Sequence, residues 1–185
     1  MLRLVMLGAP GSGKGTQASR LAETTGARHI STGDLLRAEV AAGSELGRRV
    51  AAYLDAGELV PDEVLLGLTL PLVEAAATEA GYLLDGFPRS VEQARELAVR
   101  ISPAAEVGRV IFLSVPRDEL VGRLLRRAAE QDRSDDTAEV IHRRLQVFEQ
   151  ETGSLIDYYR AAGLLATVDG AADPAEVARR IKAVL

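Results

Sequence analysis

The 185-residue chain has no cysteine and no tryptophan, only two histidines and two lysines, and no apolar run long enough to cross a membrane. Without cysteine, the fold cannot rest on disulfides or hold zinc with thiolates, so packing must stabilise it and a reducing compartment suits it. The apolar runs fall well short of about 18 residues, and the N-terminus lacks a signal-peptide pattern. We therefore expect a cytoplasmic protein with no membrane partner.

The formal net charge of −5 argues against general nucleic-acid binding, which requires a basic surface. Nearly all of the positive charge is arginine, because Lys14 and Lys182 are the only lysines. A lysine retained at one loop position fits a need for a compact point charge rather than a planar guanidinium. With 47% hydrophobic residues, a chain of this length can bury one good core, so we expect a single domain.

Short apolar runs alternate with helical patterns along the whole chain. Strands are expected at residues 4–7, 28–30, 81–85, 110–115 and 165–169. Helices are expected at residues 17–24, 32–42, 45–56, 62–79, 91–101, 117–130, 137–162 and 174–184. Each strand run is short and aliphatic or β-branched, as in strands that are buried on both faces of a parallel sheet. The alternation therefore predicts a three-layer α/β/α fold.

A glycine-rich loop, Gly8 to Thr16, follows the first strand and precedes the first helix. Glycines let successive backbone N–H groups turn inward around an anion, and the helix N-terminus adds the positive end of a dipole. The segment is therefore expected to hold a polyphosphate, with Lys14 reaching the outer phosphates. The general motif has Ser or Thr directly after the lysine. Here Gly15 comes before Thr16, so the loop alone does not predict a magnesium-bound hydroxyl.

Two further segments place anion-binding groups where strands end. Asp85 to Arg89 follows the third strand, at the edge where open parallel sheets bind ligands. A strand-end aspartate can hold magnesium-bound water, and Arg89 can bind a second phosphate group. Ser31 to Arg37 opens a helix after the second strand, which places a hydroxyl and a guanidinium near another helix N-terminus. Taken singly, Asp85 could instead cap a helix and Arg89 could be a surface charge.

Together these segments resemble the nucleoside monophosphate kinases, and specifically the adenylate kinase family. The motifs occur in order as GAPGSGKGTQ at 8–17, STGDLLR at 31–37, GELVPDE at 57–63, DGFPRSVEQ at 85–93 and RSDD at 133–136. The family also has Gly-Thr after the lysine of the loop. The resemblance implies a P-loop kinase fold with a five-stranded parallel sheet in the order 2-3-1-4-5. It also implies a small helical insertion that binds the nucleoside monophosphate, and a short lid.

The same resemblance implies how the single domain, residues 1–185, is divided and what it does. The core would comprise residues 1–30, 61–126 and 137–185, the monophosphate-binding segment residues 31–60, and the short lid residues 127–136. The implied protein is a monomer that transfers the terminal phosphoryl group of ATP to AMP, reversibly and with Mg²⁺, giving two ADP. Zinc is not expected.

The resemblance also implies roles for individual residues. The catalytic charges would be Lys14, Arg89, Arg127, Arg133 and Arg144. The ATP site would comprise Gly11, Ser12, Gly13, Lys14, Gly15, Thr16, Arg127 and the backbone of Ala172. The AMP site would comprise Thr32, Arg37, Glu58, Leu59, Val60, Gly86, Phe87, Pro88, Arg89, Gln93, Arg133 and Arg144. Asp85 would hold Mg²⁺ through water.

Adenine is the expected acceptor base because Thr32 and Gln93 stand where uridylate and cytidylate relatives typically have alanine and asparagine. Gln93 lies one helical turn beyond Arg89, so its amide can pair with the adenine edge. A uridylate or cytidylate kinase is the nearest alternative. A regulatory nucleotide-binding ATPase is another, although such a protein would not need the acceptor-site residues together. Each arginine taken alone could also lie on a solvated helix face.

Overall fold

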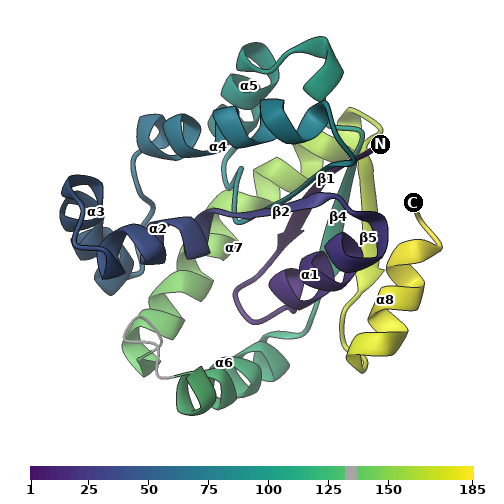
Figure 1. Cartoon of the computed structure of the whole chain (residues 1–185). Coiled ribbons are helices and arrows are strands. Elements are labelled where there is room, and N and C mark those ends of the chain that lie inside the picture. Colours follow the sequence, from purple (N-terminus) through teal and green to yellow (C-terminus); the bar gives the residue numbers. More distant parts are fainter. Residues whose placement is uncertain (132–136) are drawn as a thin grey trace.

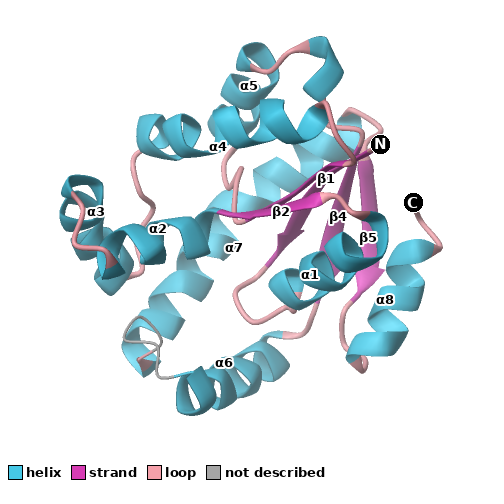
Figure 2. Cartoon of the chain, viewed as in Figure 1, coloured by secondary structure: helices cyan, strands magenta, loops and turns pink. Residues whose placement is uncertain are grey.

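The computed structural model describes residues 1–131 and 137–185, and these form a five-stranded parallel sheet with helices on both faces (Figure 1, Figure 2). The strands are β1 (Leu2–Gly8), β2 (Arg28–Ser31), β3 (Gly81–Asp85), β4 (Arg109–Ser114) and β5 (Leu165–Asp169). Their order in the sheet is β2-β3-β1-β4-β5. The predicted three-layer architecture and strand order are confirmed.

The helices lie between the strands in sequence. They are α1 (Lys14–Thr25), α2 (Thr32–Ala41), α3 (Glu45–Ala56), α4 (Asp62–Ala77), α5 (Val91–Arg100), α6 (Arg117–Gln131), α7 (Ala138–Ala161) and α8 (Pro174–Lys182), with a short 3-10 helix, η1, at Pro103–Ala105. The pair α2 and α3 extends to one side of the sheet (Figure 1). None of the helices described is both long and apolar enough to span a lipid bilayer.

The sheet carries a hydrophobic core on each face because side chains alternate along its strands. In β1, Val5 and Leu7 belong to the cluster that includes α4, α5 and α7. Leu4 and Met6 belong to the opposite cluster, which includes α1 and α8. All four residues are at least 95% buried, so β1 is held from both sides. This burial explains why its sequence reads as a continuous apolar run rather than as an alternating one.

The register of the parallel strands brings their carboxyl ends to one edge of the sheet. β1 lies between β3 and β4, with Met6 opposite Asp85 and Gly8 opposite Leu113. At the edge of the sheet, Ser31 of β2 lies opposite the same aspartate. The segments that follow β1, β2 and β3 therefore start beside one another, as the sequence motifs require.

The helix after the phosphate loop begins at Lys14 rather than at residue 17, where the apolar pattern begins. Its first turn lines a cavity, and only Gln17, Ala18 and Leu21 are buried against the protein. Hydrophobic periodicity reports the face of a helix that meets the core, so it misses a turn that faces a ligand site. The loop thus leads directly into the helix through Gly13, which is left-handed with a φ of +93°.

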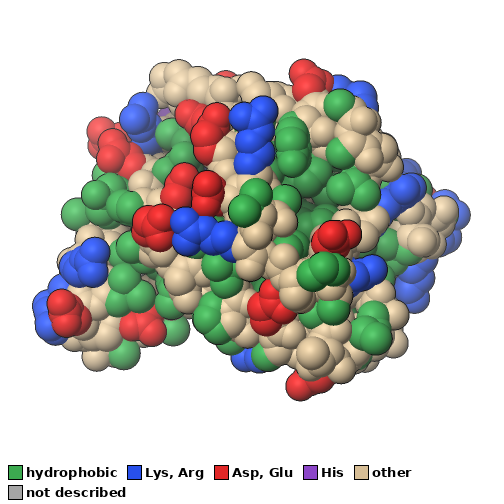
Figure 3. All heavy atoms as spheres, turned by 90° about the horizontal axis from the view of Figure 1, so that it is seen from above, with side chains coloured by type: hydrophobic (Ala, Val, Ile, Leu, Met, Phe, Trp, Pro, Cys, Tyr) green, Lys and Arg blue, Asp and Glu red, His purple; other side chains and the backbone are tan. Residues whose placement is uncertain are grey.

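Charged side chains of both signs are interspersed on the face seen from the α4 and α5 side (Figure 3). Arg100 donates to Glu96 within α5 at 2.9 Å and to Glu63 on α4 at 3.1 Å. Such exposed pairs contribute little to stability, typically about 0–1 kcal/mol each. The two buried cores, rather than surface ion pairs, therefore account for most of the stability of the fold.

Gly81 at the start of β3 leaves no room for a side chain. Its φ is +103°, and a Cβ atom there would overlap the backbone oxygen of Leu2 on the neighbouring strand. We expect Gly81→Ala to lower the free energy of unfolding by about 3 kcal/mol or more, because the strand register must shift. Gly67 lies in α4 with open space around it, so Gly67→Ala should raise the same quantity by about 0.5–1 kcal/mol. Urea unfolding measures the stability of both variants. Equal stabilities of the two variants would contradict the close approach of Gly81 to the backbone of Leu2.

Candidate active site

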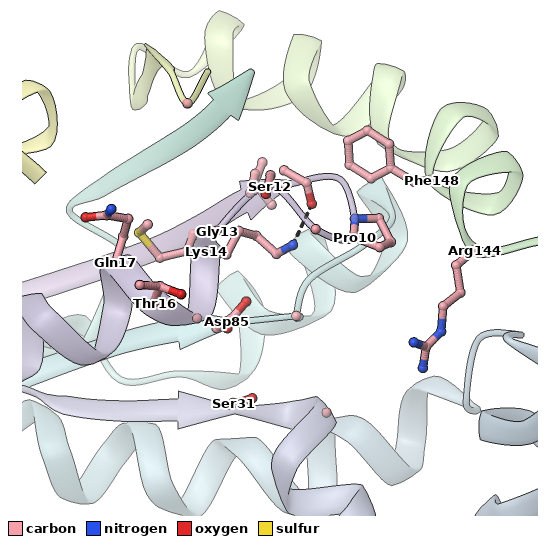
Figure 4. Close-up of a pocket in the computed structure, with 18 of the residues that line it drawn as sticks. Pro10, Ser12, Gly13, Lys14, Thr16, Gln17, Ser31, Asp85, Arg144 and Phe148 are labelled. Carbon is pink, nitrogen blue, oxygen red and sulfur yellow. Dashed lines mark hydrogen bonds between the residues drawn. The ribbon is translucent and has the colours of Figure 1, made fainter. Parts of the chain in front are cut away.

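A cavity of about 820 Å³ opens at the carboxyl edge of the sheet, a volume that suits a ligand of nucleotide size. Its walls come from the phosphate loop, the start of α2, the segment after β3, the helices α6 and α7, and the loop between β5 and α8 (Figure 4). The predicted site residues that line it are Gly11, Ser12, Gly13, Lys14, Gly15, Thr16, Arg37, Leu59, Asp85, Gly86, Pro88, Arg89, Arg127, Arg144 and Ala172.

The phosphate loop is held in a shape that only glycines tolerate. Gly11 and Gly13 have φ angles of +81° and +93°, in the left-handed region. A Cβ atom on Gly8 would lie 2.6 Å from Ser12 Oγ. Ser12 N donates to Ala9 O at 3.0 Å and closes the turn. A tight glycine loop that ends at a helix N-terminus is well suited to binding an anion.

Lys14 lies along this loop (Figure 4) and donates to two of the loop's backbone oxygens. The distances from Nζ are 2.8 Å to Gly8 O and 3.1 Å to Ala9 O. These bonds hold the ammonium group beside the loop without neutralising its charge. A third partner with a full negative charge, such as a phosphate oxygen, would therefore bind it strongly.

Positive charge is concentrated around Lys14. Burial is the main reason that the pKa of Lys14 falls from 10.5 to about 8, and Asp85 opposes this effect. The nearby guanidinium groups of Arg89, Arg127 and Arg144 lower the pKa of Lys14 further. Burial, followed by the charge of Arg144, also lowers the pKa of Arg89. The cavity is therefore electrostatically prepared for a polyanion, which would relieve the repulsion among these cations.

Asp85 ends β3 beside the phosphate loop and is 9% exposed. Its Oδ2 lies 3.6 Å from His29 Nε2, and a Cβ atom on Gly15 would lie 3.4 Å from the same oxygen. Gly15, which follows Lys14, thus faces the Asp85 carboxylate, and the first hydroxyl after the lysine is that of Thr16. A single carboxylate that faces a phosphate site fits Mg²⁺, which commonly keeps several waters and takes few protein ligands. Within the described part of the chain, no group of three or more acidic, histidine or cysteine side chains could hold a metal.

A second group of cations faces the phosphate loop from across the cavity. Arg37 on α2 forms an ion pair with Asp34, one helical turn earlier. The Nε of Arg89 donates to Gly86 O at 2.7 Å, which fixes its guanidinium near the end of β3. Arg144 enters from α7 (Figure 4). Three separate elements therefore supply cations to one wall, as expected for a site that binds a second phosphate group.

Five predicted acceptor-site residues do not line this cavity: Thr32, Glu58, Val60, Phe87 and Gln93. Val60 and Phe87 are buried in the core. The hydroxyl of Thr32 donates to the backbone oxygen of Asp85 at 3.3 Å. Glu58 is exposed and pairs with Arg143 at 3.6 Å. Arg133 lies outside the described residues.

Gln93 is 1% exposed, and both ends of its amide bind protein groups. Its Oε1 accepts from Arg89 N at 2.7 Å, and its Nε2 donates to Asp62 Oδ1 at 2.7 Å. The predicted adenine contact would require these bonds to be exchanged for bonds to a base. In this conformation the amide holds the backbone of Arg89 in place instead.

Among the cavity side chains to which sequence reasoning gave no role are Arg123 and Phe148. Arg123 on α6 donates to Gly170 O at 2.9 Å and points toward Ser12 O at 3.5 Å, so it links two loops of the site. The sequence indicates Arg123 only as one of several arginines, because a bond to a distant backbone oxygen leaves no motif. Phe148 lies one helical turn after Arg144 on α7 (Figure 4). The sequence could have indicated Phe148, because residues four apart on a helix lie on the same face as each other, here the face of Arg144.

The fold and the cavity define a nucleotide-binding α/β protein of the P-loop kinase class. Residues 6–164 match the family model described as adenylate kinase. The chain is 47% identical over 185 residues to an adenylate kinase of Stenotrophomonas maltophilia, covering 100% of this chain and 99% of the relative. It is 46% identical to those of Clavibacter michiganensis (100% and 93% covered) and of a Synechococcus strain (99% and 98%). The chain belongs to the adenylate kinase family, which makes it a phosphotransferase.

The low pKa of Lys14 makes the stability of the ligand-free protein depend on pH. Between about pH 8 and 10.5 the unfolded chain binds more protons at this residue than the folded one, so stability rises with pH there. From pH 7 to 9.5, the unfolding free energy of the unaltered protein should rise by about 2 kcal/mol more than that of Lys14→Met. Denaturant titrations at both pH values measure this. Lys182→Met, on an exposed side chain, is the control and should follow the unaltered protein; identical pH profiles for all three would contradict the prediction.

Proposed function

We propose that this chain transfers the terminal phosphoryl group of ATP to AMP, reversibly and with Mg²⁺, giving two ADP. The observation that supports this most directly is the convergence of Lys14 with Arg89, Arg127 and Arg144 in one cavity. A protein that only hydrolyses a nucleotide needs one phosphate site, whereas this cavity has a glycine loop on one wall and a second set of arginines on another.

The donor half of the proposed site is the phosphate loop and its surroundings. Gly11 to Thr16 would hold the β- and γ-phosphates with backbone N–H groups and the start of α1. Lys14 and Arg127 would neutralise the charge of the group in transfer. Ala172, in the loop between β5 and α8, would offer its backbone oxygen to the amino group of the adenine. All of these residues line the cavity.

The acceptor half lies between α2 and the segment after β3. Arg37, Arg89 and Arg144 would bind the AMP phosphate, with Leu59, Gly86 and Pro88 forming the adjacent walls. Thr32 and Gln93 would recognise the base after their present bonds to the protein are exchanged. We assign the remaining acceptor residues, Glu58, Val60 and Phe87, to the support of this wall, and Arg133 to the lid.

The chemistry requires one bond to form and one to break. An oxygen of the AMP phosphate attacks the γ-phosphorus, and the bond from that phosphorus to the β–γ bridging oxygen breaks, so that ADP leaves. The protein must place the two phosphate chains in line and neutralise charge that spreads over the moving group. Asp85 would hold Mg²⁺ through water, and the ion would supply further neutralisation of the phosphate charge; the proposed reaction involves no zinc.

We further propose that residues 31–60 act as the acceptor-binding segment and residues 127–136 as a short lid, on a core of residues 1–30, 61–126 and 137–185. Closure would exclude water, which otherwise competes with AMP for the phosphoryl group. The acceptor segment lies close to α7 of the core. A Cβ atom added at Gly57, which follows α3, would lie 3.1 Å from side-chain atoms of Val140 and of Arg144. A cytoplasmic monomer acting on ATP, ADP and AMP completes the proposal.

A panel of acceptors tests the proposed reaction. With ATP and Mg²⁺, we expect kcat/KM for AMP to exceed those for UMP, CMP and GMP by about 100-fold or more, because a site that hydrogen-bonds one base rejects others strongly. A coupled assay for ADP formation measures each value. A preference for UMP or CMP would identify a pyrimidine nucleotide kinase instead. ATP hydrolysis that AMP does not change would identify a regulatory ATPase.

Substitution of Arg89 tests the assignment of the two halves. We expect Arg89→Ala to lower kcat/KM for AMP by about 100-fold or more while the KM for ATP changes little, since a charge-assisted contact to the acceptor phosphate is lost. Steady-state kinetics with each substrate varied in turn give both values. Arg95→Ala, an exposed arginine on the following helix, is the matched control and should be unaffected. A change confined to the KM for ATP would show that the halves are assigned wrongly.

A further inference from the structure

Gln17 is a buried amide whose role no motif explains. It lies in α1, directly after the phosphate loop, and is 4% exposed. Its Nε2 donates to Pro174 O at 2.9 Å, across 157 positions of sequence. Among residues 1–131 and 137–185, nothing forms a hydrogen bond with its Oε1. A buried acceptor without a partner costs about 1–3 kcal/mol, so this side chain is not optimised for stability.

The acceptor of this bond begins α8 and ends the loop that forms one wall of the cavity. Gly170 at the start of the loop is held by Arg123, whose Nη2 donates to Gly170 O at 2.9 Å, and by its own N–H, which donates to Ser114 O at 2.9 Å. Gln17 holds the opposite end of the loop, at Pro174. Ala172 lies between these two points of attachment and lines the cavity.

We propose that Gln17 is a positioning residue that fixes the β5–α8 loop, and with it the seat of the donor base, relative to the phosphate loop. This inference rests on the proposed function, in which the backbone of Ala172 meets the adenine of ATP. Gln17 lines the cavity (Figure 4), but its Nε2 is bonded to Pro174 O and its Oε1 is shielded from solvent, so we assign its amide to the loop rather than to the nucleotide. It acts through α1, where Thr16 at the phosphate loop directly precedes it. Together with the attachment at Gly170, this hydrogen bond sets the distance between the phosphate-binding loop and the site of the base.

The bond to Pro174 is not needed to satisfy the backbone of α8. The carbonyl of the first residue of an α-helix also accepts the N–H four residues later, so Pro174 O keeps a partner when Gln17 is replaced. An apolar side chain of the same length would fill the same space and would remove the unpartnered Oε1. A purely structural role for Gln17 therefore predicts a loss of stability on such a replacement, whereas a positioning role does not.

The test uses Gln17→Met in the full chain with two donors, ATP and the triphosphate of purine riboside, which lacks the 6-amino group. We expect the KM for MgATP to rise about fivefold to tenfold, the size of one lost hydrogen bond in the seating of the base. The preference for ATP over the purine donor should fall toward one, because the loop no longer presents its carbonyl to the amino group. The KM for AMP and the melting temperature should stay close to those of the unaltered protein.

If the Gln17→Met variant does not fold, Gln17→Leu replaces it. The matched control is Gln150→Met, on the exposed face of α7. An equal rise in KM for both donors with a lower melting temperature, or no change in KM for either, would overturn the positioning role. These results differ from what is expected if the proposed function is wrong. If it is wrong, the unaltered protein itself would not form ADP from ATP and AMP.

Discussion

The site depends on holding several positive charges close together at one edge of the sheet. Lys14 donates to two backbone oxygens of its own loop, and both its pKa and that of Arg89 are lowered, chiefly by burial. Such an arrangement is unfavourable in the empty protein, and the two hydrophobic cores must offset it. A bound polyanion would relieve this repulsion. The charge repulsion that lowers the stability of the protein therefore also raises its affinity for a polyanion.

The fold and the outline of the site could be predicted because they rest on local patterns. The strands buried on both faces read as apolar runs, and the glycine loop has a spacing that few other structures require. Which members of these motifs stay outside the cavity could not be predicted. Thr32 and Gln93 belong to recognisable motifs, but their polar groups are bound to Asp85 and Asp62, and such bonds depend on packing between distant segments. The first turn of α1 was missed because it faces the cavity and carries no apolar signal.

The cavity residues contribute in two ways. Arginines, Lys14 and Asp85 from the recognised motifs supply charge. Others, such as Arg123 and Gln17, bind the backbone oxygens of Gly170 and Pro174 and hold the loops of the site. Recognition of a polyphosphate tolerates little displacement, since misplacement by about 1 Å can cost a hundredfold in rate. The second group therefore contributes to function by holding the loops of the site in position.

The central place of β1 in the sheet has a consequence for the making of the protein. β1 leaves the ribosome before its neighbours β3 and β4, which end only at Asp85 and Ser114. Parallel pairing over such separations is slow and must wait for the later segments. The phosphate loop is thus synthesised before both of the strands that frame it, and it is framed on both sides only after Ser114 has emerged. The wall formed by the β5–α8 loop follows later still, so the nucleotide site is completed long after its phosphate loop is made.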